Sequence, residues 1–283
     1  MNSRDAQDFI LRLLADGPFR AAALAAAGGN GTDGESGLGP EVAAVVSRVD
    51  LGALDRFGRF LCRHYYRERV VHYFKYGRAL APLTDRAPEK VLKAPEFTAL
   101  MPRLILGDRQ SAALVLELLR SFLIENADSI RARIPYWDDL VAYQGAFFLS
   151  DALPPNHAAT PFPARAETAT VLELGWDLPA VLPALLKPFD QVPVAAMRPT
   201  RLLFARSKHA EVTVLRCTDA LKNLLEGLSG EVAPAEIAAR LGLEAGALDK
   251  TLRQLETLGA VLAQGSFSSS HVGSDLPQAA GKW

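Results

Sequence analysis

The sequence has few cysteines and almost no net charge. Only Cys62 and Cys217 occur among 283 residues, and the formal net charge is −1. Two distant cysteines exclude a disulfide framework and a cysteine-based zinc site. A chain without surplus positive charge has no overall field that would hold nucleic acid or an anionic membrane. We expect a globular protein of a reducing compartment.

Export and membrane signals are also missing from the sequence. The first residues, MNSRDAQD, place acids where a signal peptide needs a basic region followed by an apolar stretch. No run approaches the ~20 apolar residues of a membrane span. We therefore expect a cytoplasmic protein with no membrane contact.

Metal-ligating and nucleophilic patterns are lacking as well. None of the five histidines pairs with a second His or Cys at helical or hairpin spacing, and arginines surround His64 and His72. No Gly-x-Ser-x-Gly elbow occurs, and neither cysteine has a histidine nearby in sequence. The sequence predicts no metal, no cofactor and no catalytic residue in this chain. We interpret the acid pair Asp138 and Asp139 as a helix-dipole arrangement.

Helical periodicity dominates the first half of the chain. Apolar residues at three- and four-residue spacing predict helices over 8–16, 42–77, 110–124 and 137–151. Glycine-rich residues 28–40 predict a loop too irregular for phosphate binding, and Pro82, Pro95 and Pro135 predict further loops. We expect a helical domain over 1–152 and a proline-rich linker over 153–165.

Strand patterns and then helices follow the linker. Residues 169–174 predict a strand, and 200–207 with 211–217 predict a hairpin. Helices are expected from Thr218 to Leu228, from Pro234 to Leu241 and from Ala245 to Leu258, the last two as a helix-turn-helix. The fold class is mainly α with a small β component (α+β), with a winged helix-turn-helix domain over 166–264 and a disordered tail over 265–283.

One predicted helix combines arginines with aromatic residues. Residues 47–79 hold eight Lys or Arg against three acids, together with seven aromatic residues. This mixture is enriched at protein interfaces and at nucleic-acid surfaces, although a solvated face over a helical core also explains it. The residues that we expect at a partner interface are Arg59, Arg63, Tyr66, Arg67 and Tyr73.

The helix-turn-helix raises the question of DNA. Its second helix, 244–259, carries three acids against Lys250 and Arg253, whereas a helix that enters the major groove needs surplus cations. The other use of such a domain is to add a peptide as an extra strand. We expect that strand beside the segment 211–217, with contacts from Glu211, Val212, Thr213, Val214, Leu215, Arg216, Asp249, Lys250 and Arg253. Alternation along the strand leaves open which face is buried.

Several segments resemble a known family. Thr200–Ser207 (TRLLFARS), Val212–Leu221 (VTVLRCTDAL), Leu224–Gly230 (LLEGLSG) and Ala235–Ala238 (AEIA) look like the peptide-recognition element of ribosomal-peptide modifying systems. Phe74–Arg78 (FKYGR) and Pro135–Leu140 (PYWDDL) are similar to the partner subunit of multinuclear non-haem iron TIM-barrel enzymes, which rework cysteine in precursor peptides. The resemblance covers most of residues 50–263 and is strongest to the 3-thiaglutamate type, ahead of the methanobactin type.

The resemblance implies a division of labour between two chains. The iron and the chemistry would belong to the partner enzyme, so this chain would be a non-catalytic subunit of a heterodimer. It would bind the leader part of a precursor peptide and present a cysteine to the enzyme. A winged-helix DNA-binding transcriptional regulator is the alternative, and an enzyme in its own right is a third class, against which the missing ligand cluster counts. The identity of the peptide, the cysteine modification and the stoichiometry stay open.

Overall fold

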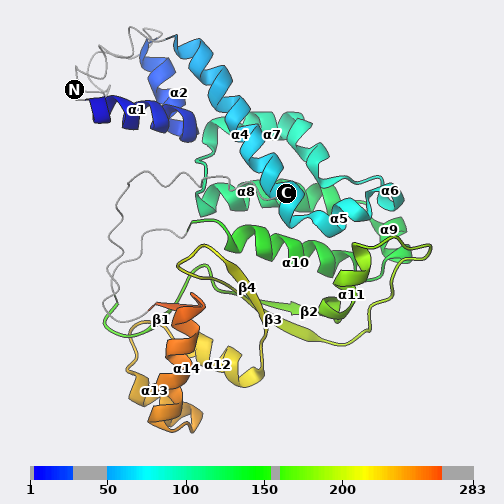
Figure 1. The fold of residues 1–283 in the computed structure, drawn as a ribbon, viewed down its shortest axis with the longest axis vertical. Coiled ribbons are helices and arrows are strands. Elements are labelled where there is room, and N and C mark those ends of the chain that lie inside the picture. Colours follow the sequence, from blue (N-terminus) through cyan, green and yellow to red (C-terminus); the bar gives the residue numbers. More distant parts are fainter. Residues whose placement is uncertain (1–2, 28–49, 154–159, 263–283) are drawn as a thin grey trace.

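The computed structural model describes residues 3–27, 50–153 and 160–262, and it is mainly helical with a small sheet. Helices form the upper part of Figure 1, a three-stranded sheet lies in the middle, and three short helices lie below. The predicted loop 28–40, the predicted tail 265–283 and part of the predicted linker 153–165 lie outside the described residues.

Two N-terminal helices pack on the start of a long third one. These are α1 (Ser3–Ala15), α2 (Gly17–Ala27) and α4 (Leu51–Tyr73). The buried Arg20 of α2 donates to the carbonyls of Leu13 and Leu14 and pairs with Asp55 of α4 at 3.1 Å. Gly58 makes room for this arginine, because a Cβ there would lie 2.6 Å from Arg20 Nη1.

Short helical pieces connect α4 to two longer helices that form the core. The connecting pieces are α5 (Lys75–Ala79), α6 (Ala81–Thr84), η1 (Pro88–Lys93), α7 (Pro95–Leu100) and η2 (Met101–Arg103). α8 (Arg109–Ile124) and α10 (Trp137–Ser150) confirm two predicted helices, with α9 (Asp128–Arg133) between them. The loops predicted at Pro82 and Pro95 are wrong. Both prolines stand in first helical turns, where the missing N–H has no helical partner to lose.

The break between α4 and α5 depends on one buried amide. Gln144 of α10 is fully buried, and its Oε1 accepts from the backbone N–H of Tyr76 at 3.0 Å and of Gly77 at 3.1 Å. A helix start leaves such N–H groups without partners inside the helix. The FKYGR segment is therefore a helix junction that α10 stabilises.

The sheet contains β2 (Thr170–Leu174), β3 (Thr200–Arg206) and β4 (Val212–Arg216) in that order, all antiparallel, which confirms the three predicted strands. α11 (Leu178–Leu185) connects β2 to β3. A two-stranded ribbon of β1 (Ala164–Arg165) and β5 (Val261–Leu262) was not predicted, because two residues are too few to show alternation.

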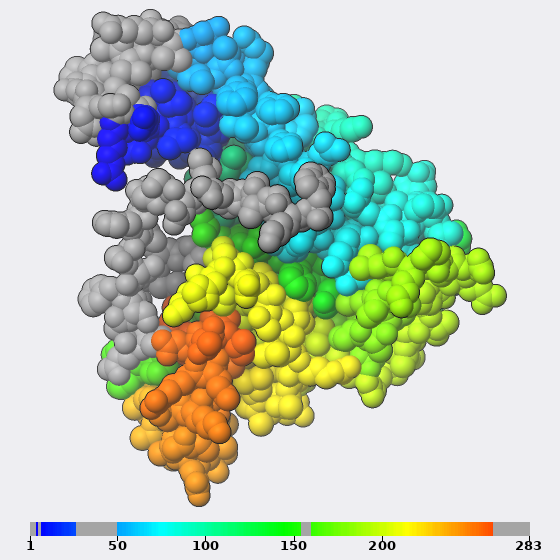
Figure 2. All heavy atoms as spheres, in the orientation of Figure 1, coloured from blue at the N-terminus to red at the C-terminus, as the bar shows by residue number. Residues whose placement is uncertain are grey.

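Three helices follow β4 as predicted. They are α12 (Asp219–Gly227), α13 (Pro234–Leu241) and α14 (Ala245–Thr257). Thr218 caps α12 by accepting from the N–H of Leu221 at 3.2 Å, and Gly242 ends α13 at φ 65°. Figure 2 shows α13 and α14 as a lobe that projects from the rest of the molecule.

The central strand β3 is buried on both faces. Leu202 and Phe204 belong to a core shared with α4, α8 and α10, whereas Leu203 and Ala205 belong to a second core with α12, α13 and α14. Because the first core also contains Leu174, it joins residues on both sides of the predicted linker. The sheet is thus the middle layer between two groups of helices.

Candidate functional site: the edge of β4

β4 has one edge without a partner strand among the described residues. Its hydrogen bonds to β3 use odd-numbered residues, as shown at the two ends by Ser207 N–H to Glu211 O at 2.9 Å and Cys217 N–H to Arg201 O at 2.8 Å. In an antiparallel pair the alternate residues point their N–H and C=O groups away. Val212, Val214 and Arg216 therefore present their backbone groups outward, off the sheet.

The side chains of β4 divide between the two faces of the sheet, and this answers the question that the sequence left open. Val214 lies opposite Phe204 and packs on the core beneath α10, so Val212, Val214 and Arg216 share the α10 face. Thr213 and Leu215 lie on the face of the three-helix core and are half-buried. Glu211 is exposed on that same face. Both faces of β4 are thus partly covered, and no strand of the described residues pairs with its outer edge.

The depression that Asp249 and Arg253 of α14 line does not include β4. Asp249 and Arg253 form an exposed i,i+4 pair at 2.5 Å and line a depression of about 390 Å³, while Lys250 is exposed beside it. The other described residues that line the depression are Pro163 and residues of α13, α14 and β5, and none belongs to β4. This depression therefore does not support the prediction that Asp249, Lys250 and Arg253 border one groove with this strand.

The predicted interface residues of α4 differ in accessibility. Arg59, Arg63 and Arg67 lie on its outer surface, where Arg59 pairs with Asp55 at 2.7 Å and Arg63 donates to Leu92 O at 3.1 Å. Tyr73 is half-buried and stacks on Phe147. Tyr66 is fully buried between Phe97 and Phe148, so its assignment to a docking surface is wrong. An arginine-rich helix does not itself reveal which of its aromatic residues face the core.

A row of exposed rings on α4 was missed. Phe57, Phe60 and His64 stack in parallel with centroid distances of 6.2 and 6.1 Å, and Phe60 is 60% exposed. Their spacing of three and four residues along a helix was the available signal. With the neighbouring arginines they form an exposed cationic and aromatic surface on α4.

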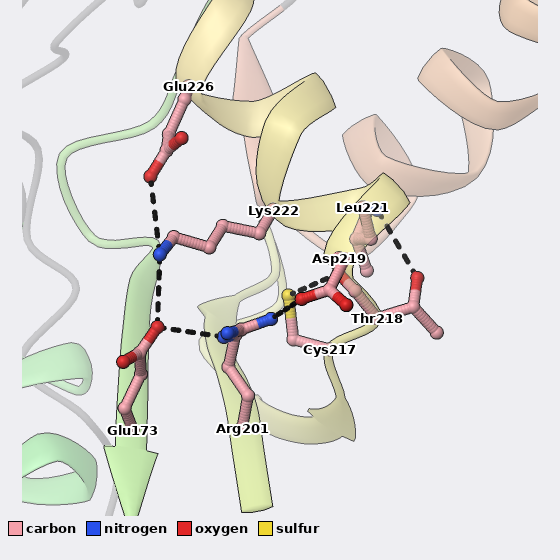
Figure 3. Close-up of polar contacts among 8 residues, drawn as sticks. All are labelled: Glu173, Arg201, Cys217, Thr218, Asp219, Leu221, Lys222 and Glu226. Carbon is pink, nitrogen blue, oxygen red and sulfur yellow. Dashed lines mark hydrogen bonds and ion pairs between the residues drawn. The ribbon is translucent and has the colours of Figure 1, made fainter.

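Charged residues tie α12 to the sheet on the three-helix face (Figure 3). Arg201 of β3 pairs with Glu173 of β2 at 2.9 Å and also with Asp219 of α12. Lys222 of α12 pairs with the same Glu173 at 3.0 Å and with Glu226 at 3.8 Å. This network holds α12 against the strands, and every cation in it has a carboxylate.

Neither cysteine of the chain has an activated thiol. Burial raises the pKa of the Cys62 thiol to about 11 although Arg20 and Arg63 act to lower it, and burial also raises the pKa of Cys217. A buried neutral thiol is a poor nucleophile. Within the described ranges, no three His, Cys, Asp or Glu side chains are grouped to bind a metal ion, and no helix there combines the length and apolarity of a membrane span.

The residues that carry the family resemblance have structural contacts. Tyr136 donates through its hydroxyl to Pro193 O at 2.6 Å, and Trp137 donates to Leu123 O at 2.9 Å. Asp139 accepts from the N–H of Trp176 at 3.0 Å, while Asp138 pairs with Arg131 at 2.8 Å. The two acids thus point to different partners. Comparison with known proteins returned no matching family model and no matching curated protein.

Proposed function

We propose that this chain is a non-catalytic, cytoplasmic subunit that binds a peptide by adding it as a strand to the outer edge of β4. The observation that carries the proposal is the row of outward backbone groups at Val212, Val214 and Arg216, directly before α12 and the two helices that follow it. Unpaired edges of this kind are templates for an incoming strand.

We take the identity of the peptide and of the partner from the resemblance of the sequence to a partner subunit of iron TIM-barrel enzymes. The peptide is the leader of a ribosomally made precursor, and the partner is a multinuclear iron TIM-barrel enzyme that modifies a cysteine in it. Iron is expected in that partner and no cofactor in this chain. The exposed surface of α4, with Phe57, Phe60, Arg63 and Arg67, is the docking surface for the enzyme.

The peptide part is tested with a displayed library of random twelve-residue peptides. A peptide selected on the wild-type chain is labelled and titrated by fluorescence anisotropy. Val214→Pro removes an outward N–H without removing a bond to β3, and we expect it to abolish binding. Val171→Pro is the matched control, because by the same alternation the N–H of Val171 points off the opposite edge at β2.

The affinities of Val214→Pro and Val171→Pro decide whether the peptide binds at the edge of β4. Circular dichroism checks that both are folded. Equal affinity for the peptide in wild type and a folded Val214→Pro variant would exclude this edge. Salt-sensitive binding of random duplex DNA by the wild-type chain would favour the alternative, a winged-helix transcriptional regulator.

The docking part is tested by co-purification of the tagged chain from its host, with metal analysis of what co-elutes. Phe60→Ala combined with Arg67→Ala removes two exposed side chains of α4, and we expect loss of an iron-containing partner. Arg120→Ala, an exposed arginine of α8, should retain it. Retention of the iron protein by both variants would exclude the α4 surface.

A further inference from the structure

Arg206, the last residue of β3, is a largely buried cation without a hydrogen bond among the described residues. Its side chain is 17% exposed, its Nε is buried and unpaired, and the nearest carboxylate oxygen, Asp151 Oδ1, lies 3.9 Å away. A guanidinium has five N–H donors, and leaving one of them unpaired away from water, as Nε is here, is costly. This end of the sheet therefore retains a cation whose donors are available.

Among the described residues, Asp151 is the carboxylate within 4 Å of Arg206, and it already pairs with another arginine. Arg69 of α4 pairs with Asp151 and donates to Phe148 O at 2.8 Å. The guanidinium of Arg69 also lies over the rings of Tyr65, Tyr73 and Phe148 at 5.0–5.5 Å. Two guanidinium groups thus share one carboxylate, and the surplus charge belongs to Arg206.

Arg206 lies within reach of a strand added to β4. It is opposite Val212, on the α10 face, and the backbone groups of Val212 point outward. An added strand would lie two strand spacings from β3, about 10 Å. Its residue opposite Val212 would share the face of Arg206, and the combined lengths of an arginine and a glutamate side chain cover that distance.

The other end of β4 repeats this excess of cations. Arg216 donates to the buried Asp177 at 2.7 Å, and Arg198 pairs with the same carboxylate. Between the two ends, Val214 is half-buried beside Phe204. The α10 face of β4 thus carries Val212, Val214 and Arg216 at alternate positions, and the cation Arg206 lies behind Val212 on β3.

We propose that the peptide strand on β4 carries one acidic residue opposite Val212 and a second opposite Arg216, with an apolar residue between them. The pattern is acid-x-apolar-x-acid, and its three named side chains face α10. This inference rests on the proposed strand addition and specifies which peptide fits. A basic residue at either end would meet a like charge, and an apolar residue opposite Val212 would leave Arg206 unpaired.

The test uses the peptides selected on wild type from the displayed library. We expect enrichment of acid-x-apolar-x-acid. In a labelled peptide with this pattern, Glu→Gln opposite Val212 should weaken binding about tenfold, the usual order for losing a charge-assisted bond. Arg206→Gln should weaken binding of the unchanged peptide equally, and in that variant the peptide substitution should have no further effect.

Two more variants make the test specific. Arg206→Lys retains the charge and should bind the acidic peptide more tightly than Arg206→Gln does. It also provides a second variant at this position if Arg206→Gln fails to fold. Arg201→Gln, on the opposite face of β3, should leave affinity unchanged. Peptides that lose binding with Val214→Pro yet show no acid preference would overturn this inference alone. Absence of any peptide sensitive to Val214→Pro would overturn the proposed function.

Discussion

The two faces of the small sheet differ in their ratio of cations to carboxylates. On the three-helix face, Arg201 and Lys222 share three carboxylates, from Glu173, Asp219 and Glu226. On the α10 face, the pairs Arg69 with Arg206 and Arg198 with Arg216 have a single carboxylate each, from Asp151 and Asp177.

The difference indicates what each set of charges does. Exposed, paired charges contribute little to stability and mainly fix how one element lies on another. The buried, unpaired Nε of Arg206 costs the fold free energy, and a ligand carboxylate could remove that cost. The charges of the balanced face therefore tie structural elements together, and the unbalanced face is where we propose that the peptide binds.

The largest expected effect comes from breaking the packing of the α10 face. Phe204→Ala removes a fully buried ring. Its centroid lies 5.4 Å from that of the Tyr143 ring and 5.7 Å from that of the Phe147 ring. We expect a loss of about 3–5 kcal/mol in the free energy of unfolding, measured with urea. Leu203→Ala, the neighbour on the other face, should cost about 2–5 kcal/mol but leave the support beneath Val214 intact. Equal peptide affinities in the two folded variants would contradict this assignment.

A second change breaks the contact between α14 and β3. Gly259 has φ 76°, and a Cβ there would lie 1.8 Å from the carbonyl oxygen of Arg206. Gly259→Ala should therefore destabilise the chain by at least about 1–3 kcal/mol, through backbone strain and displacement of the end of α14. Thermal unfolding gives the measure. Gly246→Ala, where a Cβ meets nothing within 4 Å, is the matched control and should be no less stable than wild type.

A third change sharpens the comparison through pH. Burial acts to raise the pKa of Asp177, but hydrogen bonds from Arg216 and Arg198 outweigh it, so the pKa lies below its ordinary value. A depressed carboxyl pKa gives stability that is present above the unfolded value, about 4, and is lost as pH falls through the folded value. Asp177→Asn should flatten the decline of stability in acid. An unchanged acid profile would show that the two arginines do not stabilise this carboxylate.

The smallest effect is expected on the balanced face. The pKa of Glu173 is lowered by hydrogen bonds from Lys222 and Arg201, yet the side chain is 59% exposed. Glu173→Gln should lower the unfolding midpoint slightly at low salt and not at high salt, because salt screens exposed pairs. Peptide affinity should not change. A loss of affinity comparable to that of Arg206→Gln would remove the distinction between the faces.

Local signals in the sequence were sufficient for most elements. Periodicity and caps gave α8, α10 and the helices after β4 nearly to their ends, since Thr218, Pro234 and Gly259 act within one helical turn. The prolines at 82 and 95 misled because a proline favours both loops and first helical turns. The ribbon of β1 and β5 joins segments almost a hundred residues apart, a pairing that local patterns do not encode.

The candidate site was only partly visible in the sequence. Strand alternation identified β4 and its residues, but the hydrogen-bond register that turns Val212, Val214 and Arg216 outward exists only once β3 is paired. Tyr66 and Phe60 lie on one arginine-rich helix, and packing against α7 and α10 buries the first and leaves the second exposed.

By itself the sequence determined a mainly α chain with a small sheet and the identity of the strands and helices at its C-terminal end, because these depend on interactions within a few residues. Only the tertiary structure decided that β3 is buried on both faces, that Asp249 and Arg253 line a depression apart from β4, and that Arg206 shares one carboxylate with Arg69. The physical reason is that burial, free edges and charge balance are properties of neighbours in space, and these neighbours come from α4, α10 and β3, far apart in the chain.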